Sequence, residues 1–550
     1  MSTLRLDQVL ASAALVFILA APVSALGQQT EPSQAGLRAP SKAGDASAGD
    51  ALTSPPASAT QAAAPAIAPE ESRAPDRLTA LDPADRAIAE RIRDLLDTKP
   101  NRIFADEKAH AAVEAFYQKR NLAPLWLDKG VENARSKAVI ARLKNADADG
   151  LDHADYKTPT FGGLSPDALA EAELSLTQTV LTYARHLQAG RVPHRQVRED
   201  NIALPQRAPD PAVVLAAVVE GDDASQALDQ FSPPYENYRK LKAALSQLRG
   251  RTAGGARDGI AAGRKKLNPT NDSRIDTIIA NMERWRWYHR DIRKSRVEVN
   301  EPDFTLKVIH DGRQVWTSRV VIGKPSMPSP LLAQQMDSIT INPTWKVPAS
   351  IVRNEYLPAE AREPGALARM GLRVKRVNGE VEITMPPGGK NPLGHIRFNF
   401  FNRLTVFQHD TPDQYLFAHV VRAESHGCMR VQDAPKYAEV LAGMVHPEEQ
   451  WTAEKVKSLY AGGTEQEISL GSGPIWIYWT YQTAFVDDAG KLQIRRDLYN
   501  LDSRTLAAIK GAREIANPAS ESKSEPTMAT PVPAAPAHRR KAAPMGHARS

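Results

Sequence analysis

The stretch Ser425-His426-Gly427-Cys428-Met429-Arg430-Val431 contains the only cysteine of the 550-residue chain. A single cysteine cannot form an intrachain disulfide, and it offers too few thiolates for a zinc cage. Cysteine chemistry proceeds through the thiolate, which needs a neighbouring base or positive charge. Because an arginine follows at position 430 and imidazoles lie nearby, we expect Cys428 to be a nucleophile. The alternative is a small buried hydrophobic residue, the role of most free cysteines.

Alternating apolar and polar residues surround this stretch on both sides. Val297, Val299, Leu306 and Val308 alternate with polar residues, and Asp311-Gly312 and Asn378-Gly379 are typical hairpin turns. The sequence therefore predicts a mainly β domain over residues 271–505, with a local strand from 424 to 431 that carries the cysteine. Further strands are expected at 315–322, 338–341, 372–377, 380–385, 405–408 and 475–480, with helices at 275–287 and 434–443.

The preceding region has a helical period. Ile88, Ile92, Leu95 and Leu96 share one face of a helix, and similar patterns recur towards residue 248. We therefore predict an α+β protein, in which a helical scaffold module over residues 79–250 precedes the mainly β domain. Its helices are expected near 88–96, 111–120, 136–145, 164–188, 213–219 and 235–248.

The remaining segments are predicted from composition. Residues 1–25 resemble a secretory signal, with Arg5, an apolar run and the small residues Val23-Ser24-Ala25. The alternative is an uncleaved anchor, but the run is short and broken by Pro22. An Ala/Pro/Ser-rich linker is expected over 26–78, a Gly-rich basic connector over 251–270 and a disordered basic tail over 506–550.

Charge and export limit the classes of partner. The formal net charge is +6, which suits nucleic acid, anionic lipid or an acidic polymer. Export makes nucleic acid an improbable partner, and no later segment is apolar enough to cross a bilayer. With one cysteine, an exported protein must be stabilised by core packing and not by disulfides.

Two groups of residues resemble a known family. His409-Asp410-Thr411 followed by Ser425 to Val431 resembles the catalytic domain of L,D-transpeptidases, which are bacterial cell-wall enzymes. Pro124-Leu125-Trp126, Asp149-Gly150-Leu151-Asp152 and Arg284-Trp285-Arg286-Trp287 resemble the large periplasmic subgroup with a helical scaffold. The resemblance covers about residues 80–500 and implies peptidoglycan stem peptides as substrates, cell-wall synthesis machinery as a partner, and a periplasmic location.

The resemblance also implies roles for the candidate site residues. Cys428 would form a thioester with the donor, and His409 would be the general base, oriented by a backbone carbonyl. Backbone N–H groups near Gly427 and Cys428 suit an oxyanion hole, with Ser425 and His426 beside them as substrate-binding residues. Arg430 would bind a substrate carboxylate or orient the loop, since residues two apart in a strand share a face.

Other roles for the nearby polar residues stay open. His426 is the rival base, because it too is two residues from the cysteine, although the subgroup pattern favours His409. Asp410 is at most a helper, and His419 is expected to be a framework or surface residue. Trp285 and Trp287 are expected in the core.

Several alternative functions remain at this point. The same thioester could pass to water, in an L,D-carboxypeptidase, or to a lipoprotein lysine. A metallopeptidase using His409, His419, His426 and Cys428 lacks the expected carboxylate-rich motif, and a non-catalytic wall-binding protein would bury its thiol. No metal or cofactor is expected. The 20 or so residues from Leu248 to Asn268 are too few for the wall-binding repeat that many members insert there.

Overall fold

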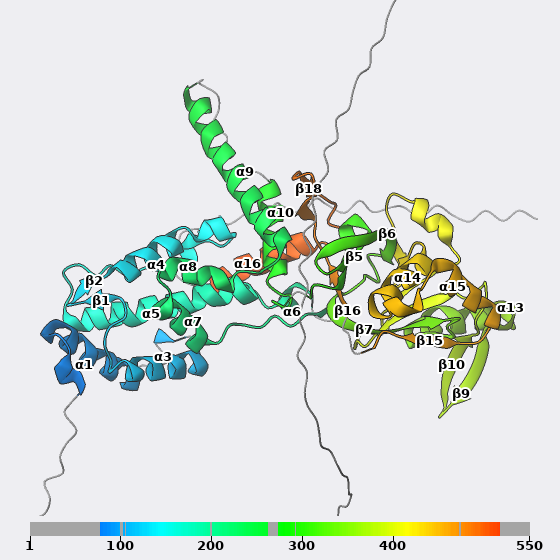
Figure 1. The fold of residues 1–550 in the computed structure, drawn as a ribbon, viewed down its shortest axis with the longest axis horizontal. Coiled ribbons are helices and arrows are strands. Elements are labelled where there is room, and N and C mark those ends of the chain that lie inside the picture. The colour runs from blue at the N-terminus through cyan, green and yellow to red at the C-terminus, as the bar shows by residue number, and fades with distance from the viewer. Residues whose placement is uncertain are drawn as a thin grey trace, which may run out of the picture. The chain divides into compact units, whose positions relative to one another are not determined.

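The computed structural model describes residues 77–98, 103–104, 106–198, 201–261, 273–291, 293–471 and 475–516, with only the backbone described at 251–261 and 513–516. These residues fall within one compact unit, Arg73–Ser550. Its first part is helical and its second part is mainly β, which confirms the predicted fold class (Figure 1). The predicted signal and most of the predicted linker lie outside the described residues. No helix among the described residues is long and apolar enough to span a membrane.

The helical part is stabilised by its own apolar core. This core includes Ile92, Val113, Trp126 and Tyr183. The helix that begins at Glu107 has a polar N-terminal cap, because the Asp106 side chain accepts the Ala109 N–H. The elements are α1 (Pro83–Thr98), α3 (Glu107–Lys119), β1 (Leu127–Asp128), β2 (Val131–Glu132), α4 (Ala134–Lys144), α5 (Pro166–Ala189), α6 (His194–Val197), β3 (Ile202–Ala203), α7 (Pro211–Glu220) and α8 (Ala224–Ala227).

Two longer helices connect this part to the β domain. Helix α9 spans Glu236–Ala261, and helix α10 spans Ser273–Trp285. Helix α9 extends to Ala261 through much of the predicted Gly-rich connector, so the predicted end of this helix at residue 248 was too early. Three alanines in this stretch favour helix and offset its glycines. The apolar residues Tyr238, Leu241 and Leu245 of α9 belong to the same core as the β domain.

Two buried arginines, one in the last turn of helix α10 and one just after the helix, face different parts of the molecule. Arg284 donates to the Tyr481 carbonyl at 3.0 Å and pairs with Asp502 at 2.6 Å. Arg286 pairs with Glu283 at 2.9 Å and donates to the Asp149 carbonyl in the helical part. The intervening Trp285 and the following Trp287 are buried core residues. Since each buried charge has a partner, this segment ties the two parts together.

The β domain is built on a sheet that closes on itself. The pairing runs β11-β12-β14-β6-β5-β4-β16-β7, and β11 also pairs with β7. Closure leaves few free edges and places apolar residues inside. The elements are β4 (Arg296–Asn300), β5 (Thr305–His310), β6 (Arg313–Gly323), β7 (Leu331–Ile341), β11 (Ile396–Phe400), β12 (Gln408–His409), β13 (Ala423–Ser425), β14 (Met429–Val431), α14 (Ala434–Val445), α15 (Ala453–Ser458), β15 (Gln466–Ser469), β16 (Ile475–Thr480), β17 (Ala484–Val486), β18 (Leu492–Ile494) and α16 (Leu501–Ala516).

A small subdomain is inserted between β7 and β11. It has its own apolar cluster, which includes Trp345, Leu367 and Ile383. Its elements are β8 (Trp345–Lys346), α11 (Ala349–Ile351), a π-helical turn (Val352–Tyr356), α12 (Leu357–Arg362), α13 (Ala366–Arg369), β9 (Arg373–Val377) and β10 (Glu380–Met385). The predicted turn Asn378-Gly379 joins β9 to β10, and both residues have positive φ.

The C-terminal end of the fold differs from the prediction. Helix α16 continues to Ala516, whereas the sequence placed the start of a disordered tail at residue 506. Ile509 packs into the main core, and Thr505 is fully buried. The net positive charge of the tail concealed the apolar positions of its first ten or so residues.

Candidate active site

Cys428 lies in a tight turn between two strands and not within one strand. The turn consists of residues 426–428, with β13 before it and β14 after it. Gly427 has φ +110°, a backbone conformation that residues other than glycine rarely adopt. The predicted continuous strand from 424 to 431 was therefore wrong at its centre. Breaking the strand separates the directions of His426 and Cys428, which a regular strand would have placed on one face.

Ser425 closes this turn with its hydroxyl. The hydroxyl donates to the Cys428 carbonyl at 2.5 Å and accepts the Gly427 N–H at 3.2 Å. Ser425 is buried, so both bonds are shielded from water. The Gly427 N–H is thus already used. Within the part of the chain that the structure describes, the Cys428 N–H has no acceptor, which leaves it as the candidate oxyanion donor of this turn.

His409 lies on the strand next to the cysteine. Strand β12 runs parallel to β14, with His409 opposite Arg430. The Nδ1 atom of His409 lies 2.5 Å from the Asp410 carbonyl oxygen. A carbonyl only accepts, so Nδ1 carries the proton and Nε2 is left as the basic nitrogen. His409 is buried, and the sheet pairing fixes its backbone.

The Asp410 side chain has other partners. It accepts the His395 N–H at 2.9 Å and the Gln414 amide at 3.4 Å. A side chain on Gly394 would overlap its carboxyl group, so this packing requires glycine there. Asp410 therefore orients the imidazole of His409 through its backbone and not through its carboxylate.

Burial keeps both reacting groups neutral at rest. Burial raises the pKa of the Cys428 thiol to about 11, although the Phe407 N–H and the Arg430 charge oppose the rise. Burial, with a smaller contribution from the Arg430 charge, lowers the pKa of His409 to about 3, although the Asp410 hydrogen bond opposes this shift. With both groups neutral, proton transfer during attack is favoured over a pre-formed thiolate–imidazolium pair.

The positive charge of Arg430 acts on the candidate site, and its guanidinium is held by Asp413, which the sequence analysis missed. Its guanidinium pairs with Asp413 at 2.8 Å and is largely buried. Asp413 precedes the 3₁₀ helix Gln414–Ala418, which starts just after His409. The charge of Arg430 reaches both Cys428 and His409. Any substrate carboxylate would have to compete with Asp413 for this arginine.

His426 faces a different set of groups. Its Nε2 lies 3.0 Å from a carboxylate oxygen of Glu355, in the inserted subdomain, and 3.3 Å from the Lys324 ammonium. About a third of its side chain is exposed to solvent. Lys324 and Glu355 are more than a hundred and more than seventy residues away in sequence, and no local signal marked them.

The four groups of the metallopeptidase alternative do not converge. His419 pairs with Glu424 at 2.6 Å, His426 with Glu355, and His409 with the Asp410 carbonyl. Among the described residues, the two groups of side chains close enough to share an ion are Asp147, Asp152 and His153, and His446, Glu448 and Glu449. Neither group includes Cys428 or one of these three histidines.

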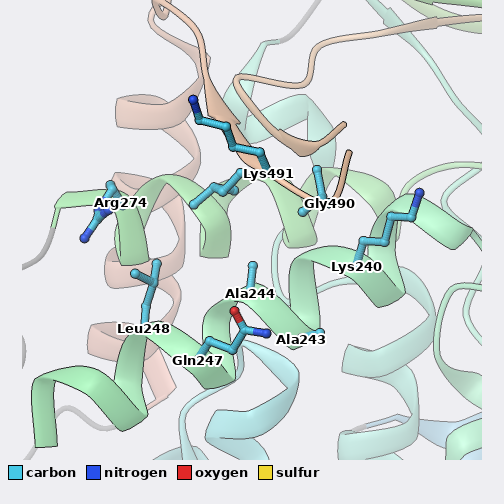
Figure 2. Close-up of a pocket in the computed structure, with 10 residues that line it drawn as sticks. Lys240, Ala243, Ala244, Gln247, Leu248, Arg274, Gly490 and Lys491 are labelled. Carbon is cyan, nitrogen blue, oxygen red and sulfur yellow. The ribbon is translucent and has the colours of Figure 1, made fainter. Parts of the chain in front are cut away.

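One described cavity lies apart from the cysteine turn. It measures about 390 Å³ and is formed by α9, the first turn of α10 and the β17–β18 hairpin (Figure 2). In this view the nitrogen ends of Lys240, Arg274 and Lys491 lie towards its periphery and not over its centre. None of the predicted site residues lines it, so it is not part of the candidate active site.

Two parts of the chain match models of known protein domains. A scaffold-domain model matches residues 111–245, and a model of the L,D-transpeptidase catalytic domain matches residues 294–457. A Haemophilus influenzae protein named "Putative L,D-transpeptidase" is 25% identical over 221 residues, 37% of this chain and 44% of that protein. The chain thus spans less than half the length of this relative.

A solved structure was also matched, that of the Ldtfm–avibactam carbamoyl enzyme. It is 14% identical, with a TM-score of 0.17, over 34% of this chain and 49% of that one.

The match to the catalytic-domain model includes His409, Cys428 and the rest of the cysteine turn. The chain therefore carries an L,D-transpeptidase catalytic domain at residues 294–457, and a scaffold domain at residues 111–245 of the helical part precedes it.

Proposed function

We propose that the protein is an exported peptidoglycan L,D-transpeptidase that forms 3→3 crosslinks through a thioester on Cys428. The donor is a tetrapeptide stem, and its terminal D-alanine is released. The observation that carries this proposal is the placement of His409 on β12, which pairs with the strand that directly follows the lone thiol, together with the bond from its Nδ1 to a carbonyl, which leaves Nε2 unprotonated.

The first half-reaction assigns one task to each group. The Cys428 sulfur attacks the carbonyl of the third stem residue while Nε2 of His409 takes the thiol proton. The resulting oxyanion is stabilised by the Cys428 N–H. Collapse of the tetrahedral intermediate breaks the bond to D-alanine, whose amine leaves with the proton from His409. A thioester on Cys428 remains.

The second half-reaction reverses these roles. An acceptor amine attacks the thioester, and His409 accepts a proton from that amine. The thiol then leaves and is regenerated. If the amine belongs to the diamino acid of another stem, the product is a 3→3 crosslink. Water would give an L,D-carboxypeptidase, and a lipoprotein lysine would give wall anchoring.

The location and partners follow from the same proposal. A wall substrate requires an enzyme outside the cytoplasm, which agrees with the predicted signal at residues 1–25. We propose the periplasm as its location and the cell-wall synthesis machinery as its partner. The chemistry is assigned to the thiol and the imidazole, so the proposal needs no metal or cofactor.

Purified protein incubated with tetrapeptide muropeptides provides the test. We expect D-alanine release and a crosslinked dimer, both identified by mass spectrometry. A shortened tripeptide without a dimer would favour the carboxypeptidase. If wild type and Cys428→Ala give the same products, the proposal is wrong.

A further inference from the structure

The loop that follows β6 reaches the back of the cysteine turn through Ser329. Ser329 is fully buried. Its hydroxyl donates to the Gly427 carbonyl at 2.9 Å and accepts the Gly323 N–H at 3.0 Å. A hydroxyl has one proton, so the carbonyl receives the donated bond and the amide supplies the accepted one. The direction of the bond to Gly427 is therefore fixed.

This bond sets the direction of the Cys428 N–H. The carbonyl of Gly427 and the N–H of Cys428 belong to one peptide unit, which is planar and in the trans form points the two groups in opposite directions. Ser329 holds the carbonyl on the buried side, so the N–H points away from Ser329. Ser425 holds the groups on either side, the Gly427 N–H and the Cys428 carbonyl. Two serines thus leave this peptide little freedom to turn.

The loop of Ser329 is itself held from two distant parts of the chain. From the helical part, the side-chain amide of Asn201 donates to the Pro328 carbonyl at 2.9 Å and the Ser329 carbonyl at 3.3 Å. The backbone carbonyl of Asn201 accepts the Leu331 N–H. Strand β3 then pairs with β7 directly after this point. From the C-terminal segment, the Tyr499 hydroxyl donates to the Gly323 carbonyl at 2.5 Å.

Gly323, at which β6 ends and this loop begins, is tightly packed against the loop. A side chain on Gly323 would overlap the Met327 carbonyl and the Ser329 N–H. The Lys324 N–H also binds the Ser425 carbonyl at 2.9 Å, next to the cysteine turn. A displacement at Asn201 or Tyr499 would therefore pass to Ser329 and not be absorbed within the loop.

We propose that Ser329 is a positioning residue that aims the Cys428 N–H at the developing oxyanion, and that Asn201 supports it from the helical part. The helical part then contributes to catalysis as well as to attachment. This inference rests on the proposed acyl transfer at Cys428. It adds a residue from another part of the fold whose loss should weaken stabilisation of the oxyanion without altering the nucleophile.

Two small thiol probes separate this role from a structural one. A p-nitrophenyl ester acylates the thiol through a tetrahedral oxyanion, whereas iodoacetamide alkylates it without forming one. For Ser329→Ala we expect the acylation rate to fall by about tenfold, which is less than the roughly hundred- to thousandfold loss seen when an oxyanion donor is itself removed, because the Cys428 N–H stays and only its direction is freed. The alkylation rate should stay within about twofold of wild type.

Matched variants make the result specific. Ser338→Ala removes another buried serine, whose hydroxyl binds Asn399 and not the cysteine turn, and should leave both rates unchanged. Asn201→Ala should lower acylation selectively, by about threefold. Ser329→Thr retains the hydroxyl and should recover part of the acylation rate. Thermal unfolding of each variant checks the fold, and Asn201→Ala decides the case if Ser329→Ala does not fold.

The inference is overturned if acylation and alkylation fall together, or if neither Ser329→Ala nor Asn201→Ala changes the ratio of the two rates. The ester is not a wall substrate, so this result is independent of the muropeptide assay. A changed ratio with no muropeptide product would retain the positioning role and reject the proposed function.

Discussion

The two histidines nearest to Cys428 have opposite environments. His409 is buried on β12, and its ring is oriented by the backbone carbonyl of Asp410. His426 is partly exposed at the end of the cysteine turn, between the side chains of Glu355 and Lys324. A backbone partner on a paired strand fixes a ring more firmly than exposed side chains do, because exposed ion pairs contribute little and are screened. The comparison favours His409 over His426 as the base of the proposed reaction.

The largest effect should come from the residue that both histidines flank. Cys428→Ala should reduce D-alanine release by at least about a thousandfold, because no other nucleophile is assigned to the site. Thermal unfolding should change little, since the replacement by alanine removes only the sulfur atom. Cys428→Ser should be nearly as inactive, because a hydroxyl is far less ionised than a thiol. Release that persists in the alanine variant would show that another group performs the attack.

Replacing each histidine tests the comparison directly. His409→Ala should slow acylation by about a hundredfold or more, as expected for loss of a general base. His426→Ala should slow it by less than about tenfold. Single-turnover D-alanine release measures both rates on proteins with matched melting temperatures. A larger loss in the His426 variant would exchange the two assignments.

The pH dependence of thiol alkylation tests the neutral resting pair. The pKa of Cys428 is raised to about 11 and that of His409 is lowered to about 3. At neutral pH the thiolate is therefore a small fraction that grows about tenfold for each pH unit while the pH stays below the thiol pKa. The iodoacetamide rate should rise steadily between pH 6 and pH 9. A plateau that begins below pH 7 would instead indicate a thiolate paired with a charged imidazole.

The smallest effect concerns metal. Dialysis against EDTA should leave D-alanine release within about twofold of the untreated protein, since thiol and imidazole suffice for the assigned chemistry. A protein inactivated by EDTA and restored by zinc would support the metallopeptidase alternative. Cys428→Ala provides the baseline for both measurements.

The sequence predicted those parts of the fold that depend on local patterns. Period and turn chemistry located β10 and β16 at their observed bounds, and Asp311-Gly312 and Asn378-Gly379 form the predicted turns. Helix α9 past residue 250 was missed because Gly and Arg are frequent there, and helix α16 past residue 505 was missed because its apolar residues were assigned to the basic tail. Tertiary contacts and backbone hydrogen bonds outweigh such propensities.

The site could be predicted only where its residues are close in sequence. Cys428, Ser425 and Gly427 form one turn, and His409 is less than twenty residues away. Ser329 and Glu355 contact this turn, and Asn201 contacts the loop of Ser329, through packing between segments that are distant in sequence. Nothing in their own sequence contexts marks them. The direction of His426 was also not predictable, because it depends on the positive φ of Gly427.

The central claim is that Cys428 becomes acylated by a stem peptide. The most direct measurement is the intact-protein mass after incubation with a tetrapeptide donor and no acceptor amine, followed by peptide mapping. We expect one addition equal to the donor less D-alanine, located on Cys428 and accumulating far more slowly in His409→Ala. D-alanine release with no addition at Cys428, or an addition on another residue, would contradict the account.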